Sequence, residues 1–352
     1  MKKIISLISC FAMCAAFSVP VFADEEVGAE QTNGDVVLIS EEVTEIPDDE
    51  SIAPELPEFS DMPDNWTTQA LKNAVKNGLL KGDGDKIMPD NNIKRSEMAA
   101  IIVRAFGATK EAENIDKYVD LDKDKWYYPE FSRAVAMKFF QGNDQNEVKP
   151  EDNITFQECY TVISRLFITA GYENDPKITP PNKDVKCLEK FDDYNQVADW
   201  AKNNTANLVG YGFWNGIENK LMPTDYITRS EFAVLMDNIV TTYIDEPGTY
   251  ADLPEGNVLV RSEGVTIDGL KTDGLIVVGD GVEGETVISN VESTELIVGR
   301  GGTLKVSGVI NNITALTGNT VLDISKVTKR NGIFYLLASG AEIVVGDIVA
   351  DM

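Results

Sequence analysis

The sequence predicts two structural classes in one chain, a three-repeat all-α helical bundle followed by an all-β module. Repeated tryptophan, glycine and proline spacings between residues 59 and 244 predict the bundle. Beyond residue 250, short β-rich runs alternate with glycine, and only two aromatic residues occur. A chain of 352 residues is long enough to form several domains, so a mixed multidomain protein is expected.

The first segment of the chain has the pattern of a signal peptide. Lys2 and Lys3 precede an apolar stretch over residues 4–21, and Ala23 ends a cleavage-site pattern. A lipobox-like stretch ending at Cys10 is the alternative, but the apolar run before it is short. We therefore expect residues 1–23 to be removed and the protein to be secreted. No later segment resembles a membrane span.

An acidic leader follows at residues 24–58. It contains thirteen Asp or Glu residues and no Lys or Arg, a composition typical of a disordered spacer. The whole chain has 31 basic and 58 acidic residues, a net charge of −27, which argues against nucleic acid and anionic membranes as partners. It also has no histidine, the commonest general base and metal ligand.

Three repeats are expected at residues 59–110, 118–170 and 190–244. Each tryptophan of the repeat precedes a glycine by sixteen residues, and a later proline precedes a glutamate by eight. Apolar residues at helical spacing predict helix, loop and helix in every copy. One such hairpin is small for a core of its own, so the three should pack together. The repeated residues are Trp66, Trp126 and Trp200; Gly82, Gly142 and Gly216; and Glu97, Glu158 and Glu231.

The start of each second helix carries the most informative motif. Thr228 and Glu231 form a capping box, as do Thr155 and Glu158, whereas Lys94 breaks the box of the first copy. Arginine then stands at the first helical position, where free backbone N–H groups and the helix dipole favour an anion. A surface salt bridge to a nearby acid is the alternative reading.

Taken together, the Phe-x-Asp, Trp, Gly, Pro and Ile-Thr-Arg-Ser-Glu elements resemble S-layer homology repeats over residues 59–244. The resemblance implies a pseudo-threefold bundle whose inter-repeat grooves bind an anionic, pyruvate-bearing secondary polysaccharide of the cell wall. It implies that arginine contacts the acidic sugar and that aspartates and glycines shape the groove and contact the sugar. The residues concerned are Arg95, Arg229, Asp61, Asp193, Gly82 and Gly216. Trp66 and Trp200 are further candidates for the sugar, although general burial tendencies place these tryptophans in the core.

The second repeat departs from this family pattern. Phe156 replaces the arginine, and Lys138 replaces a glycine found at 78 and 212. We therefore expect two competent grooves, with the second repeat contributing mainly structure. An aromatic ring at 156 that stacks on a sugar is the alternative.

Metal and cofactor sites are not predicted. Asp120, Asp122 and Asp124 copy the start of a calcium loop, but the glycine and glutamate that such a loop needs are Lys125 and Phe131. These aspartates are expected to make turns and to cap the first helix of each repeat. Separately, Cys159 and Cys187 could pair in an exported protein, or Cys159 could be a buried thiol.

The β-rich module spans residues 250–352. Its strand-like runs recur every nine or ten residues with glycine or asparagine turns, which favours a β-solenoid. A β-sandwich is the alternative, but sandwiches usually place an aromatic residue in the core. The expected runs are 258–260, 265–267, 275–278, 286–289, 295–298, 303–306, 312–316, 320–324, 333–337 and 342–345.

The function expected from these features is non-covalent anchoring at the cell wall and surface. In this reading the repeats bind the wall polysaccharide and display the β-module, which has other surface proteins as candidate partners. One alternative is a wall-tethered polysaccharide-acting enzyme, and another is a self-assembling surface-layer component. The module's carboxylates lie at strand ends and glycine turns, where solvation explains them, so no enzyme is expected. These carboxylates include Asp268, Asp273, Asp280 and Glu283.

Overall fold

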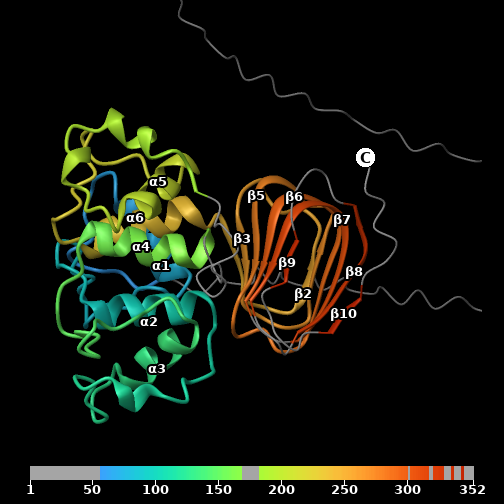
Figure 1. Ribbon diagram of the computed structural model, residues 1–352, viewed down its shortest axis with the longest axis horizontal. Coiled ribbons are helices and arrows are strands. Elements are labelled where there is room, and N and C mark those ends of the chain that lie inside the picture. The colour runs from blue at the N-terminus through green and yellow to red at the C-terminus, as the bar shows by residue number, and fades with distance from the viewer. Residues whose placement is uncertain are drawn as a thin grey trace, which may run out of the picture. The chain divides into compact units, whose positions relative to one another are not determined.

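A computed structural model gives the arrangement of the bundle and of most of the β-module. The described residues are 56–168, 182–299, 302–316, 320–328, 334–336 and 342–344. The expected signal peptide and nearly all of the acidic leader lie outside them. Helices fill the first part of this described chain and strands the second, as the sequence predicts (Figure 1). Within the same residues, no helix has the length and apolar character needed to cross a membrane.

Each repeat contributes two helices to the bundle. They are α1 (Thr68–Lys76), α2 (Arg95–Ala105), α3 (Tyr128–Ala136), α4 (Phe156–Phe167), α5 (Lys202–Gly210) and α6 (Arg229–Ile239). Short 3₁₀ turns connect them at η1 (Ile115–Lys117), η3 (Val185–Lys190) and η4 (Tyr194–Gln196). The main helix contacts run between repeats, with α1 on α6, α2 on α3 and α4 on α5. The three repeats therefore interlock in a cycle and bury one shared core, as expected for hairpins of this size.

A ring of three isoleucines holds the centre of the bundle. Ile93 N–H donates to the Ile227 carbonyl (3.0 Å), Ile227 N–H to the Ile154 carbonyl (3.1 Å), and Ile154 N–H to the Ile93 carbonyl (3.0 Å). All three side chains are fully buried. Because each isoleucine follows its repeat's proline by four residues, this ring gives the repeated proline-to-isoleucine spacing a structural cause.

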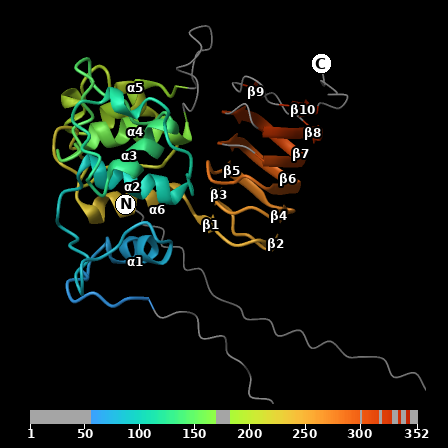
Figure 2. The same ribbon diagram turned by 90° about the horizontal axis from the view of Figure 1, so that it is seen from below.

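The β-module is a solenoid of parallel strands. Its strands are β1 (Thr242–Ile244), β2 (Gly248–Tyr250), β3 (Val258–Val260), β4 (Val265–Asp268), β5 (Lys271–Val278), β6 (Glu285–Val298), β7 (Gly302–Ala315), β8 (Thr320–Thr328), β9 (Phe334–Leu336) and β10 (Glu342–Val344). Every pairing among them is parallel, and Val258 aligns with Ile276 and Ile276 with Leu296, one coil apart each time. Figure 2 shows the coils stacked as successive rungs. The β-sandwich alternative is thus wrong, because its strands would pair mainly antiparallel.

Two long strands bend around the corners of the solenoid. The sequence predicts separate runs at 286–289 and 295–298, whereas β6 is continuous through both. Its register with β7 shifts between Ile288 and Val291, and Asn290 there has a φ of 55°. In β7, Gly308 makes the corresponding turn with a φ of 116°. The short segments that follow these turns pair with their counterparts in neighbouring coils and form a third face of the solenoid. The sequence periodicity of nine or ten residues did not predict this face as a separate strand.

Side chains of the solenoid alternate between two apolar cores. Val258, Val260 and Ile276 point inward and pack with one another along the coils. Leu259 and Val277 point outward and join the core cluster of the helices. The described residues of the helical bundle and of the β-module belong to one compact unit. The β-module is therefore packed against the bundle rather than carried on a free tether.

Backbone contacts join the module to the bundle as well. Gly281 N–H donates to the Phe106 carbonyl (3.1 Å), just beyond the end of α2. A Cβ at Gly281 would overlap the Gly107 carbonyl, so only glycine permits this approach. The Asn257 amide donates to the Ile239 carbonyl at the end of α6 (2.6 Å).

Candidate functional site

The first residue of each second helix lies at a junction between two repeats. Its backbone N–H donates to a carbonyl in the loop of the following repeat, with the third repeat closing back on the first. These bonds run from Arg95 to Asp152 (2.9 Å), from Phe156 to Asp225 (3.0 Å) and from Arg229 to Asn91 (2.9 Å). The expectation that these N–H groups are free to seat an anion is therefore wrong, because neighbouring carbonyls already satisfy them.

Arg95 extends from α2 into the loop of the second repeat. Its Nε donates to the Val148 carbonyl (2.8 Å), and its Nη1 pairs with Glu158 Oε1 (3.3 Å). The guanidinium lies over the Phe140 ring, 5.3 Å from its centroid. Burial lowers the pKa of Arg95, while the Glu158 carboxylate opposes that shift. The arginine predicted to meet a ligand thus also fastens two repeats together.

Arg229 makes the equivalent junction between the third repeat and the first. Its Nε donates to the Ile87 carbonyl (2.9 Å) and its Nη2 to the Lys81 carbonyl (2.8 Å). Its Nη1 pairs with Glu97 (3.4 Å), and only 6% of the residue is exposed. The alternative of a salt bridge to a nearby acid is therefore confirmed, but its expected place on the surface is wrong, because Arg229 is buried and the pair links two repeats.

The junction of the second repeat with the third contains no arginine. Phe156 is 1% exposed, and its ring lies 5.8 Å from Tyr160 and 6.0 Å from Trp214. The Tyr160 hydroxyl donates to the Leu221 carbonyl (2.8 Å). Leu221 is the counterpart of Val148 and Ile87, so Tyr160 replaces the bond that the arginine Nε makes elsewhere. Stacking of Phe156 on a sugar is excluded by its burial.

Each motif glutamate caps the start of a second helix, and two of them also join neighbouring repeats. The Oε2 of Glu158 accepts the Thr155 N–H (2.9 Å), and that of Glu231 accepts the Thr228 N–H (2.8 Å), so both predicted capping boxes form. Glu97 likewise accepts the Lys94 N–H (2.8 Å), so only the hydroxyl half of the first box is lost. In Glu97 and Glu158, the other oxygen pairs with an arginine of a neighbouring repeat.

Asp61 and Asp193 fix the loop that leads to each junction. Asp61 accepts the N–H groups of Ile87 (2.7 Å) and Met88 (2.9 Å), and Asp193 accepts those of Leu221 and Met222 (2.8 Å each). Asp120 does the same in the second repeat. These aspartates were expected to cap the first helices, which is wrong, because the chain makes the bonds 26 to 29 residues later. The hydrogen bonds show that these aspartates hold the loop backbone, and a contact with sugar stays a prediction.

Gly82 and Gly216 make room for the aromatic residue of the Phe-x-Asp element. A Cβ on Gly82 would overlap the Phe59 ring and lie 2.6 Å from the Lys86 carbonyl oxygen. A Cβ on Gly216 would lie 2.6 Å from both the Phe191 ring and the Lys220 carbonyl oxygen. The glycines therefore allow the aromatic ring to pack against the loop backbone.

The three repeated tryptophans are exposed. Trp66 and Trp126 are each 57% exposed, and Trp200 is 56% exposed, so their predicted place in the core is wrong. Each tryptophan lies just before the first helix of its repeat. The residue after it points inward instead, as Thr67 does after Trp66. The third repeat has a buried tryptophan, Trp214, at a position without a tryptophan in the other copies.

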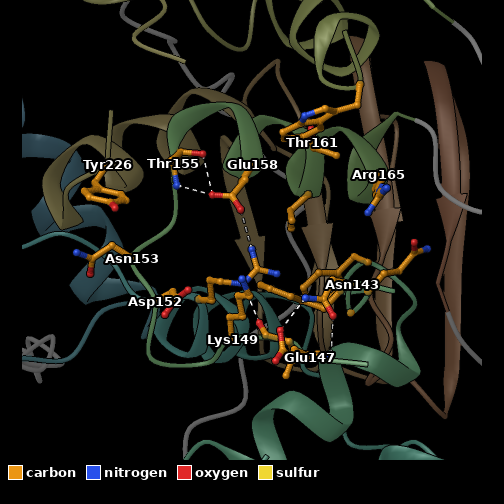
Figure 3. Close-up of a pocket in the computed structure, with 18 residues that line it drawn as sticks. Asn143, Glu147, Lys149, Asp152, Asn153, Thr155, Glu158, Thr161, Arg165 and Tyr226 are labelled. Atoms are coloured by element: carbon orange, nitrogen blue, oxygen red, sulfur yellow. Dashed lines mark hydrogen bonds and ion pairs between the residues drawn. The ribbon is translucent and has the colours of Figure 1, made fainter. Parts of the chain in front are cut away.

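A groove of about 630 Å³ opens beside Arg95 (Figure 3). Its floor and walls come from the second repeat, with Asn143, Glu147, Lys149, Thr161 and Arg165 among the lining residues. The third repeat adds two exposed aromatic residues, Trp200 and Tyr226. Figure 3 places Tyr226 and Arg165 at opposite ends of the groove. Such a mixture of cations, amides and aromatic faces suits an anionic carbohydrate.

Sequence reasoning missed several of these lining residues. Asn143, Lys149, Arg165 and Tyr226 do not belong to the repeated motif. The available signal was a difference between copies, since Lys149 aligns with Met88 and Met222 when the repeats are superimposed on their prolines. Residues that recur in every repeat are mainly those that each junction needs for folding.

Metal ligands and disulfides give no further site in the part of the chain that the structure describes. That part has no group of three potential metal-ligating side chains. Asp122 accepts the Asp124 N–H (3.0 Å), the turn expected there. Cys159 and Cys187 are free thiols, and burial raises the pKa of Cys159 well above its usual value. The buried-thiol reading of Cys159 is therefore confirmed.

The comparison with protein families matches the helical repeats. The S-layer homology domain model matches residues 58–99, 117–158 and 190–233, one match for each repeat. Each match begins within one residue of a predicted repeat start, and the matches include Arg95, Phe156 and Arg229. They place the chain at the cell surface, attached to the cell wall.

Several known proteins are similar to about half of this chain. The chain is 27% identical to "Exoglucanase XynX" of Acetivibrio thermocellus over 180 residues, 51% of this chain and 16% of that protein. It is 31% identical to "Cell surface glycoprotein 1" of Acetivibrio thermocellus over 163 residues, 45% of this chain and 7% of the relative. It is 24% identical to a "Cellulosome-anchoring protein" of that species over 196 residues, 51% and 41% of the two chains. The chain therefore spans less than half the length of each relative.

Proposed function

From the premise that this chain carries three S-layer homology domains, we propose that it anchors a surface module by binding an anionic, pyruvate-bearing secondary polysaccharide of the cell wall. The observation that carries this proposal is the groove beside Arg95. It combines Arg95, Lys149 and Arg165 with the exposed rings of Trp200 and Tyr226. Planar rings support sugar faces, and cations pair with carboxylate substituents.

The charge distribution supports binding at this place rather than over the whole surface. The full chain has 31 basic against 58 acidic residues, so its general field repels a polyanion. The groove lining has as many cationic side chains as carboxylates, since Glu147, Asp152 and Glu158 face the three cations. Glu158 is already paired with Arg95, and Glu147 accepts the Asn143 amide (2.8 Å). Local contacts can therefore overcome the general repulsion.

The β-module is proposed to be the displayed part of the protein, with other surface proteins as candidate partners. We propose a binding role for the chain rather than catalysis. Among the acids considered for an enzyme, Asp268 accepts hydrogen bonds from Ser289 and Asn290, which lowers its pKa, and Asp280 is buried. The hydrogen bonds of Asp268 and the burial of Asp280 favour structural roles for both carboxylates.

The test uses residues 24–352 and walls purified from the bacterium that produces the protein. One wall sample keeps its secondary polymer, and a second has the polymer extracted chemically. We expect sedimentation with the first sample, loss of binding to the second, and competition by the released polymer. Equal binding to both wall samples, with no competition, would overturn the proposal.

A further inference from the structure

The three junctions share one backbone but offer different side chains to a ligand. Lys149, Met88 and Met222 occupy equivalent positions, with φ values of 52°, 55° and 50°. An aspartate of the same repeat holds each of them by the backbone N–H. Only the groove beside Arg95 therefore has a lysine at this place, and its Cα position is fixed by a left-handed backbone that few residues adopt without support.

Tyr226 is a second difference between the junctions. It precedes Arg229 by three residues, and the other two copies have asparagine there, Asn92 and Asn153. Tyr226 is 52% exposed and lines the same groove as Lys149. Its ring therefore presents a large apolar area to solvent without being part of the core.

Trp200 completes the set from another element of the third repeat. It lies just before α5, and the neighbouring Ala198 N–H donates to the Gln157 side chain on α4 (3.0 Å). This contact fixes the loop beside the groove, so Trp200 and Tyr226 approach one groove from two segments of the same repeat. Two separate aromatic faces match a ligand of at least two rings better than a single sugar.

The other junctions lack this combination. The junction of Arg229 has Met88 at the lysine position and Asn153 at the tyrosine position. The remaining junction is filled by Phe156, Tyr160 and Trp214, all of which are buried. Three repeats of one sequence pattern thus give one junction with an extra cation and an extra aromatic face.

We propose that the groove beside Arg95 is the selective subsite of the bundle and takes an acidic oligosaccharide of two or more sugar units. Lys149 pairs with the acidic substituent, and Trp200 and Tyr226 support successive sugar rings. This inference rests on the proposed wall-polymer function. It adds which groove recognises the acidic substituent and how many sugar units that groove binds.

The experiment compares two groove variants with two matched controls. Lys149→Met and Tyr226→Asn convert each groove residue to one that another repeat already carries at that position. Lys110→Met and Tyr194→Asn remove an exposed lysine and a 43% exposed tyrosine that do not line the groove. Calorimetric titration uses polymer released from walls, before and after mild acid removes its pyruvate groups. Thermal unfolding checks that every variant is folded.

Each variant has a distinct expected result. Lys149→Met should weaken binding of the intact polymer about tenfold, which corresponds to ~1.4 kcal/mol, and should have no effect with the pyruvate-free polymer. Tyr226→Asn should weaken binding of both polymers to a similar degree, because mild acid does not change the face of the sugar ring. The two controls should match the unmodified protein.

Other results would overturn the proposal. If Lys149→Met binds like Lys110→Met, the groove does not depend on this cation. If Lys149→Met also weakens binding of the pyruvate-free polymer, Lys149 does not recognise the acidic substituent. If Tyr226→Asn binds like Tyr194→Asn, the second ring is not supported there. Failure of the unmodified protein to bind either polymer would instead overturn the proposed function itself.

Discussion

The two arginine junctions and the aromatic junction solve the same structural problem with different chemistry. In the first two, a guanidinium satisfies a loop carbonyl and a glutamate of the next repeat. In the third, Phe156 and Trp214 fill the space, and the Tyr160 hydroxyl satisfies the same carbonyl. The difference teaches that Phe156 is one member of a coupled replacement, because Tyr160 also replaces the alanines found at 99 and 233.

This coupling explains why a folded bundle tolerates the loss of one arginine. A buried charge is stable only with partners, and its removal leaves those partners unsatisfied. The second repeat supplies a new donor for the carbonyl and apolar rings for the volume.

The largest effect should come from Phe156→Arg. The guanidinium would enter a space filled by Tyr160 and Trp214, with the Leu221 carbonyl already bonded. A buried charge with incomplete partners should lower the free energy of unfolding by ~4 kcal/mol, measured by urea denaturation.

The control for this prediction is the double variant Phe156→Arg, Tyr160→Ala. Removing the tyrosine opens the space and frees the Leu221 carbonyl, while Glu231 stands where Glu97 and Glu158 pair with arginine elsewhere. We expect a double-mutant cycle with at least ~2 kcal/mol of favourable coupling. Additive losses would show that the two replacements are independent.

The next effect concerns the two arginines themselves. Arg229→Ala removes donors to two carbonyls and leaves Glu97 unpaired, so unfolding should become easier by ~3 kcal/mol. Arg95→Ala should cost less, about 2 kcal/mol, because the Arg95 side chain is 15% exposed against 7% for Arg229. Urea denaturation of the two variants side by side checks the ranking. The opposite order would mean that exposure does not set the strength of these junctions.

This prediction bears on how wall binding should be tested. An arginine variant that loses binding could have lost the bundle geometry instead of a ligand contact. Lys149 is exposed, and no ion pair joins it to another repeat in the part of the chain that the structure describes. Its substitution therefore separates recognition from folding better than substitution of Arg95 or Arg229.

The fold was largely predictable because its signals are periodic. Helix pairs followed from apolar spacing, capping boxes from Thr155 and Thr228, and the solenoid from regular aliphatic runs without aromatics. The corners of the solenoid were missed, since Asn290 and Gly308 turn the chain inside continuous strands. Alternation of apolar and polar residues does not reveal a turn inside a strand when the residues before and after the turn still pair with neighbouring coils.

The site was less predictable because repeated residues serve the fold first. Asp61 and Gly82 carry the family pattern, yet they hold a loop and accommodate a ring. The tryptophans were misplaced because average burial says little about a residue at a turn. Lys149 and Tyr226 become visible only when equivalent positions of the three repeats are compared in space.

Glu295 offers a contrast to the paired charges of the junctions. It is buried, and burial raises its pKa from 4.5 to about 7, while a hydrogen bond from Thr314 (3.3 Å) opposes the shift. The unfolded chain ionises first, so this group's contribution to stability is complete below about pH 4.5 and is lost as pH rises through about 7. Glu295→Gln should therefore be more stable than the unmodified protein by ~2 kcal/mol at alkaline pH.

Urea denaturation across this pH range measures the difference. Glu295→Gln should remove part of the pH dependence, while Glu283→Gln, an exposed acid of the same module, should keep it. This result would show that a buried carboxylate without a cation destabilises the fold, as we expect for the junction arginines without their glutamates. Parallel pH profiles for the two variants would contradict the buried-carboxyl interpretation.

The smallest effect should come from the other departure of the second repeat. Lys138 follows α3 with a φ of 66°, where the first and third repeats have Gly78 at 67° and Gly212 at 79°. A left-handed backbone costs a lysine roughly 1–2 kcal/mol, and glycine avoids that cost but loses more entropy on folding. Lys138→Gly should therefore raise the free energy of unfolding by only ~0.5 kcal/mol. Gly78→Lys and Gly212→Lys should lower it by a similar amount, measured by urea denaturation. A loss of stability in Lys138→Gly would show that this lysine, like Phe156, has compensating contacts in its own repeat.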